Sequence, residues 1–171
     1  MTITRTKSRT IKAGGVASSA GPRGRFADLD EDKLRGGYYT SPKVAEWLCG
    51  WAIQSADDAV LEPSCGDGAF LEAAARRLRA LGATPAKIAR LLTGVEIIPA
   101  EARSATERLQ PVLGKSAEKI IQNSDFFAWW QASDQPAFDA IIGNPPFIRY
   151  QSFPEPHRTI AMSIMGEQGL T

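Results

Sequence analysis

A short apolar strand that runs through a glycine-rich turn into a helix constrains the fold of this chain more than any other feature. Residues 59–62 have strand character, Gly66 and Gly68 lie in the turn, and apolar residues repeat at helical spacing over 70–81. Gly82 is placed to end that helix in a left-handed conformation. Such a unit is typical of nucleotide-binding parallel sheets, because glycines let a ligand approach the backbone at the carboxyl end of the strand.

The spacing of the two glycines argues against a nicotinamide or flavin site. A Gly-x-Gly pair on its own is a weak signal. The dinucleotide fingerprint also needs a small residue three positions after the second glycine, and Leu71 stands there.

A second strand, residues 92–97, ends with Glu96 followed by Ile97 and leads into a helical pattern over 100–113. A carboxylate at that strand end is placed to accept hydrogen bonds from both ribose hydroxyls of an adenosine. A solvated surface glutamate is the alternative, and base rates favour it for any single acid. The apolar residues on both sides of Glu96 favour the ligand interpretation.

A third strand over 119–122 is followed by Asp125 and Phe126. Asp125 is placed to accept from the adenine amine of a bound adenosine, with Phe126 against the ring. It is equally well placed to cap a helix over 126–131. The local sequence leaves both roles open.

A fourth apolar strand over 138–142 leads into a motif suited to chemistry on a planar amine. The motif consists of Gly143, Asn144, Pro145, Pro146 and Phe147. The lone pair of such an amine is delocalised, so a catalyst must draw the nitrogen towards tetrahedral geometry with hydrogen-bond acceptors. Asn144 offers an uncharged oxygen, Pro146 restricts the backbone that aims the Pro145 carbonyl, and Phe147 offers a stacking face. An ordinary strand-to-loop exit is the alternative for an Asn-Pro pair alone.

Taken together, residues 36–151 resemble the S-adenosylmethionine-dependent DNA adenine methyltransferases of restriction-modification systems, in the gamma order of motifs. The residues that match the family's cofactor motifs are Tyr39, Thr40, Glu62, Pro63, Cys65, Gly66, Gly68, Glu96, Ile97, Asp125 and Phe126. The residues that match its catalytic motif are Asn144, Pro145, Pro146 and Phe147. Ser41 separates Thr40 from Pro42, so the resemblance leaves two hydroxyls as candidates for contact with the methionine end of the cofactor.

The resemblance implies an α/β domain with the Rossmann-like methyltransferase fold and parallel strands in the order 3-2-1-4. S-adenosylmethionine would lie across the carboxyl ends of the first two strands. An adenine flipped out of double-stranded DNA would receive the methyl group by direct transfer, with no metal. The family adds three strands and a target-recognition domain after the catalytic motif, whereas about twenty residues follow Gln151 here. We therefore expect an N-terminal part of the enzyme, whose remaining half a second chain would supply.

Two other functions stay open at this point. A protein-glutamine methyltransferase presents a similar planar amide to an Asn-Pro-Pro motif, but that family normally has a helical domain before the glycine turn. An inactive fragment that binds the cofactor or a partner chain is the more distant alternative.

Composition fits one globular domain preceded by an arm. The chain has 171 residues, 43% of them hydrophobic, and a net charge of +1. Residues 1–34 form a basic and then acidic arm that either follows DNA phosphates or is a plain solvated tail, and the domain extends over 35–171. No apolar run is long enough to span a membrane. Cys49 and Cys65 lack metal-ligand spacing and predict reduced thiols in a cytoplasmic protein, with Cys65 filling space.

Three expectations concern residues outside the motifs. After an N-cap at Ser41, a helix is expected to bury its large apolar residues, Val44, Trp47, Leu48 and Trp51. His157 is expected to be an exposed residue at a helix start. Trp129 and Trp130 are expected to belong to a packed helix rather than to a nucleic-acid surface.

Overall fold

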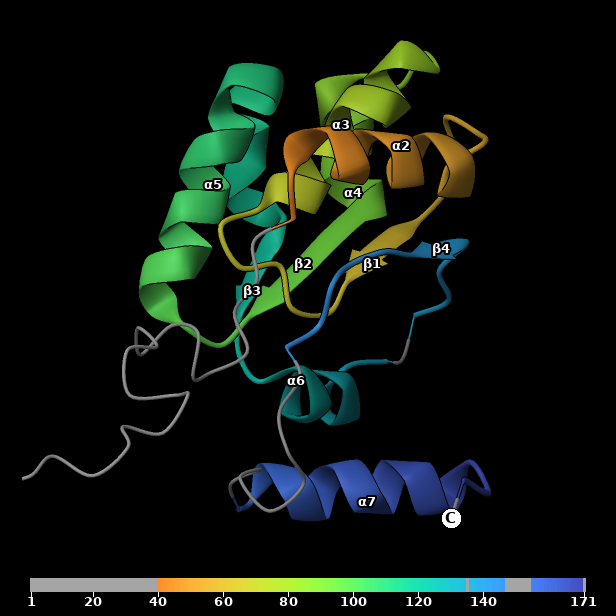
Figure 1. Ribbon diagram of the computed structural model, residues 1–171, viewed down its shortest axis with the longest axis vertical. Coiled ribbons are helices and arrows are strands. Elements are labelled where there is room, and N and C mark those ends of the chain that lie inside the picture. The colour runs from red at the N-terminus through yellow and green to blue at the C-terminus, as the bar shows by residue number, and fades with distance from the viewer. Residues whose placement is uncertain (1–39, 135, 147–154, 171) are drawn as a thin grey trace, which may run out of the picture.

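The computed structural model describes residues 40–134, 136–146 and 155–170, and within them a four-stranded parallel sheet forms the centre (Figure 1). The strands are β1 (Val60–Glu62), β2 (Leu92–Glu96), β3 (Ile121–Asn123) and β4 (Ala140–Ile141). Their spatial order is β3-β2-β1-β4, and all three pairings are parallel. The predicted α/β class and the predicted order 3-2-1-4 are therefore confirmed.

Helices cover both faces of the sheet. They are α2 (Pro42–Ala52), α3 (Ala69–Ala80), α4 (Pro85–Leu91), α5 (Pro99–Leu113), the 3-10 helix η1 (Gly114–Lys119), α6 (Phe126–Ala132) and α7 (His157–Glu167). In Figure 1, α2 to α5 lie on one side of the sheet, while α6 and α7 lie on the other. Among the described residues, no helix combines the length and apolar character needed to cross a membrane.

The main core lies between the sheet and the layer formed by helices α2 to α5. Val60 of β1, Leu92 of β2, and Leu71 and Leu78 of α3 are almost entirely buried in it. Burying one such side chain contributes about 1.5–3 kcal/mol, so this layer fixes how α3 lies on the strands. The helix ends as predicted, because Gly82 has a φ of 104° and the Ala83 N–H donates to the Leu78 carbonyl.

The expectation for α2 is right about the helix and wrong about its buried face. Trp47 and Trp51 are 71% and 75% exposed, and Val44 is exposed as well. The residues that α2 buries completely are Ala45 and Cys49, with Leu48 half-buried. Small side chains let α2 approach α3 closely, and Cys49 Sγ lies 3.7 Å from the Phe70 carbonyl oxygen. Close backbone approach, rather than side-chain size, decides which face is buried. Ser41 occupies the N-cap position, although its side chain makes no capping hydrogen bond.

The parallel register brings the functional motifs to one edge of the sheet. Glu62 is paired with Gly94, and Glu96 is paired with Asn123, so the chain leaves β1, β2 and β3 on the same side. The segment after β4 leaves on that side too, since β4 runs parallel to β1. The candidate site is therefore built from loops that meet at the carboxyl ends of the strands.

Candidate functional site

The glycine turn after β1 is held against β2 by backbone hydrogen bonds. The Cys65 N–H donates to the Val95 carbonyl at 2.9 Å, and the Gly68 N–H donates to the Cys65 carbonyl at 2.8 Å. Gly66 and Gly68 have φ values of 51° and 83°, which L side chains rarely adopt. A Cβ at Gly68 would meet the Ala105 Cα at 2.9 Å, whereas one at Gly66 would meet nothing within 4 Å. Gly68 therefore serves helix packing, and Gly66 leaves room for a ligand.

Cys65, inside the same turn, has a packing role. Its side chain is buried, and its Sγ lies 3.2 Å from where a Cβ on Gly94 would be. Burial raises the pKa of its thiol, and the neighbouring carboxylates of Glu62, Glu96 and Asp67 raise it further. The expected role as a small space-filling residue agrees with this environment.

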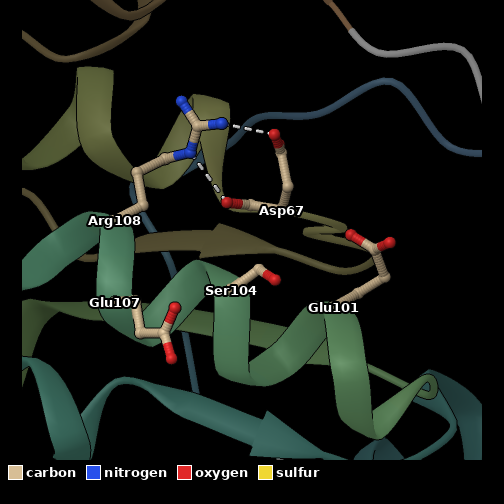
Figure 2. A pocket seen from close by; sticks show the side chains of 5 residues that line it. All are labelled: Asp67, Glu101, Ser104, Glu107 and Arg108. Carbon is tan, nitrogen blue, oxygen red and sulfur yellow. Dashed lines mark hydrogen bonds and ion pairs between the residues drawn. The ribbon is translucent and has the colours of Figure 1, made fainter.

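An arginine of α5 fixes the turn from its helical side. Arg108 Nε donates to the Asp67 carbonyl at 2.8 Å, and one terminal nitrogen binds the Asp67 carboxylate (Figure 2). The other terminal nitrogen lies 3.4 Å from Glu72 Oε2. Arg108 could not be predicted from the sequence, since nothing in its local pattern distinguishes it from other helical arginines. The open hollow in Figure 2 runs along α5 and is lined by Asp67, Glu101, Ser104, Glu107 and Arg108. No predicted cofactor residue lines it, and it meets the glycine turn only at Asp67.

Glu96 is part of the site framework and not a solvated surface acid. Its side chain is 7% exposed. One carboxylate oxygen accepts from the Gly66 N–H and the other from the Ile98 N–H, both at 2.8 Å. Asn123 Nδ2 donates to the Glu96 backbone carbonyl at 2.7 Å, which ties β3 to the same point. Each carboxylate oxygen keeps a second lone pair, and the adjacent Ile97 is exposed.

Glu62, the last residue of β1, is the most deeply buried acid of the site. It is 2% exposed, and its Oε2 atom has no hydrogen-bond partner among the described residues. Burial raises the pKa of Glu62 well above its ordinary range. The nearby carboxylates of Asp67 and Glu96 raise it further, while a backbone hydrogen bond from Leu71 lowers it. A buried polar atom without a hydrogen-bond partner destabilises the folded protein. A bound proton or a ligand at this oxygen would relieve that penalty.

Asp125 caps α6, which is one of its two expected roles. Its Oδ1 accepts from the Ala128 N–H at 3.0 Å. His157 Nδ1 lies 3.3 Å from the same oxygen without hydrogen-bond alignment. The His157 side chain is 28% exposed, so the expected helix start is right and the expected exposure is wrong. Packing of α7 against α6 covers the ring.

Phe126, next to Asp125, is half-buried and meets Phe127 edge to face, with ring centroids 5.5 Å apart. Trp129 and Trp130 are half-buried on the same helix, with Trp129 6.1 Å and Trp130 6.3 Å from the Phe126 ring. These ring contacts lie within α6, none of whose residues is fully buried, and the helix packs against α7 and β2.

The motif that is predicted to be catalytic begins beside Glu62. Gly143 has a φ of 149°, and a Cβ there would lie 3.5 Å from Glu62 Cγ, 3.6 Å from Glu62 Oε1 and 3.9 Å from Pro63 Cδ. Asn144, Pro145 and Pro146 follow and are exposed. The structure thus brings the end of β1, the glycine turn and the start of the motif together. Thr40 is half-buried just before α2, and the predicted residues Tyr39 and Phe147 lie outside the described residues.

The described residues hold no group of three or more His, Cys, Asp or Glu side chains arranged to bind a metal ion. The candidate site therefore consists of backbone donors, buried carboxylates, an exposed apolar residue and an exposed amide.

Comparison with known proteins identifies relatives of the chain. Residues 24–159 match the model of the N-6 DNA Methylase family. The chain is 29% identical over 143 residues to the type II methyltransferase M.BstVI of Geobacillus stearothermophilus, covering 70% of this chain and 26% of that protein. It is 29% identical over 129 residues to M.HincII of Haemophilus influenzae, covering 74% and 20%. The chain thus spans about a quarter or less of the length of these curated relatives.

A solved structure from Vibrio vulnificus YJ016 has the same fold over most of this chain. It is described as a modification subunit of a proposed type I restriction enzyme. The match has a TM-score of 0.53 and 21% identity, and it covers 85% of this chain and 31% of that one.

Proposed function

Because the chain belongs to the N-6 DNA methylase family, a family of enzymes, we propose that it binds S-adenosylmethionine and that its catalytic motif acts on the N6 amine of adenine in double-stranded DNA. The observation that carries the proposal is the bridge from the Glu96 carboxylate to the Gly66 N–H, made at the sheet edge from which Asn144 emerges. The bridge joins the acid expected to hold ribose to the turn expected to face the cofactor.

The residues present fit the cofactor. Open space beside Gly66 admits a ligand against the backbone, and the free lone pairs of Glu96 suit ribose hydroxyls. Exposed Ile97 offers an apolar surface for the adenine ring. The unpartnered Glu62 oxygen, with Asp67 and Glu96 nearby, suits a ligand that carries positive charge. S-adenosylmethionine carries both a sulfonium and an ammonium group.

In the proposed mechanism the cofactor supplies the electrophilic methyl group, and the protein supplies orientation. The Asn144 side-chain oxygen and the Pro145 carbonyl would accept the two amine hydrogens and hold the nitrogen in line for attack. Phe147 would stack on the flipped base. No general base is required, because the amine proton becomes acidic once the nitrogen has attacked. Positioning and polarisation of this kind supply most of the rate acceleration in such a mechanism.

Complete, site-specific activity is proposed to need a further protein segment. The chain corresponds to between 20% and 26% of the curated relatives, so most of their length lies outside the matched region. Target recognition by the part of these relatives that lies outside the matched region is consistent with this coverage.

The test combines cofactor binding with methyl transfer. The purified chain is titrated with S-adenosylmethionine, and labelled cofactor is then supplied with mixed-sequence duplex DNA or with a release-factor-like protein. The proposal expects saturable binding, and any label transferred should be recovered as N6-methyladenine after digestion of the DNA to nucleosides. Label recovered in glutamine would support the protein-methyltransferase alternative. Failure of the folded chain to bind the cofactor would refute the proposal.

A further inference from the structure

Glu62 is a buried acid whose protonation state can change when a ligand binds. Its carboxyl group lies between the glycine turn and the first residue of the catalytic motif, with Oε1 3.6 Å from the position of a Cβ on Gly143. Its other oxygen is buried and has no partner among the described residues. A buried ionised carboxylate without a partner is strongly disfavoured, so the group is either protonated or paired with a cation.

The charged and titratable groups around Glu62 favour the protonated form in the absence of ligand. The acids that act on it are Asp67 of the glycine turn and Glu96 of β2. The thiols that face it are Cys49 of α2 and Cys65 of the turn, and burial raises the pKa of Cys49 to about 12, so both stay neutral. From α3, the Leu71 N–H offers one neutral donor. The α3 acid Glu72 is already paired with Arg76 and Arg108.

The neighbouring cation does not neutralise Glu62. Arg108 binds the Asp67 backbone oxygen, the Asp67 carboxylate and Glu72, and no contact joins it to Glu62 among the described residues. Gly143 contributes no charge from the β4 side. The site therefore has two buried carboxyl groups, Glu62 and Glu96, beside the partly exposed Asp67, and no cation of the described residues pairs with Glu62.

We propose that Glu62 is protonated in the ligand-free site and releases that proton to solvent when the positively charged cofactor binds beside it. The inference rests on the proposed function, because it takes S-adenosylmethionine as the ligand. The balance is simple: one O–H bond of the carboxylic acid breaks, the proton goes to the buffer, and the carboxylate pairs with the cofactor's positive charge. Cofactor binding thereby gives the buried Glu62 Oε2 atom a partner.

The direction of the pH dependence follows from this linkage. Where the pH lies below the pKa of Glu62 in both states, the acid keeps its proton and none is released. Where the pH lies above both values, the proton is already absent before binding. Between the two, affinity for the cofactor rises with pH by at most about tenfold per unit, because binding releases up to one proton.

The decisive experiment is calorimetric titration of the chain with S-adenosylmethionine in two buffers of different ionisation enthalpy, at several pH values between about 6 and 8. The difference in apparent enthalpy between buffers gives the number of protons released per cofactor bound. We expect release in the wild-type chain and a loss of that release in Glu62→Gln, which keeps the size of the side chain. Glu107→Gln is the matched control, since Glu107 is an exposed acid on α5, and it should release protons as the wild type does.

A parallel titration with S-adenosylhomocysteine identifies the cation involved. That product keeps the ammonium group and lacks the sulfonium charge. Equal proton release with both ligands assigns the ammonium as the partner of Glu62, and release with S-adenosylmethionine alone assigns the sulfonium; either result supports the proposal. Binding without proton release, or release that persists in Glu62→Gln, overturns the proposal while leaving the proposed function intact. A folded chain that binds neither ligand overturns both.

Discussion

The Glu96 carboxylate accepts the Gly66 N–H at 2.8 Å, so the acid at the end of β2 holds the glycine turn that follows β1. Because its other oxygen accepts the Ile98 N–H, the carboxylate also fixes the start of α5. One buried side chain thus joins the two strand ends that are proposed to hold the cofactor.

Replacing Glu96 should weaken cofactor binding. Glu96→Ala is expected to cost about 1–3 kcal/mol of binding free energy, through loss of charge-assisted hydrogen bonds to ribose. Glu96→Gln should lose less, because one oxygen remains as an acceptor. Calorimetry on variants shown to be folded by circular dichroism measures both. Unchanged cofactor affinity in the alanine variant would show that Glu96 does not contact the cofactor.

Replacing Asn144 should separate chemistry from binding. In an active preparation, Asn144→Ala is expected to abolish most methyl transfer and to leave cofactor affinity nearly unchanged, because its proposed contact is to the substrate amine. Single-turnover transfer and a cofactor titration on the same sample test this. A comparable loss in both measurements would make Asn144 a structural residue.

Removing the Arg108 contact should loosen the glycine turn. Arg108→Met keeps much of the packing but removes the bonds to Asp67 and Glu72. Both ion-pair partners are partly exposed, so the expected loss of unfolding free energy is modest, about 1 kcal/mol, and it should shrink at high salt. Urea unfolding at two salt concentrations measures it. Arg103→Met, at an exposed position of α5, is the control and should change little.

The buried thiols should be unreactive in the folded chain. Burial raises the pKa of Cys49 to about 12 and also raises that of Cys65, so the reactive thiolate is scarce at neutral pH. Mass spectrometry after iodoacetamide treatment should find both cysteines unmodified in buffer and both modified in denaturant. Rapid labelling of Cys65 without unfolding would show that the turn opens.

The purified chain should self-associate. Trp47 and Trp51 expose an apolar stripe on α2, and β4 pairs only with β1 among the described residues. An open parallel strand and exposed apolar surface both favour association. Sedimentation should therefore show species larger than a monomer, and Trp47→Ser combined with Trp51→Ser should shift the distribution towards monomer. A stable wild-type monomer with site-specific methylation activity would contradict the view that this chain needs a further segment.

Local apolar patterns in the sequence predict the strands and the strand-end position of the motifs, whereas the strand order 3-2-1-4 was predicted from the resemblance to the methyltransferase family. The face that α2 buries could not be predicted from apolar spacing, since Ala45 and Cys49 pack closely on α3 while the larger Trp47 and Trp51 stay outside. Two contacts between residues far apart in the sequence could not be predicted either. Arg108 meets Asp67 across 41 positions, and His157 lies against Asp125 only because α7 packs on α6.

The central claim is that S-adenosylmethionine binds at the ends of β1 and β2, and residue-resolved NMR tests it most directly. In a titration of the labelled chain, the backbone amides of Gly66, Gly68 and Ile97 should shift saturably, while those of Ser104 and Glu107, in the hollow along α5, should not. Shifts confined to that hollow, or no saturable shift in the folded chain, would contradict the account.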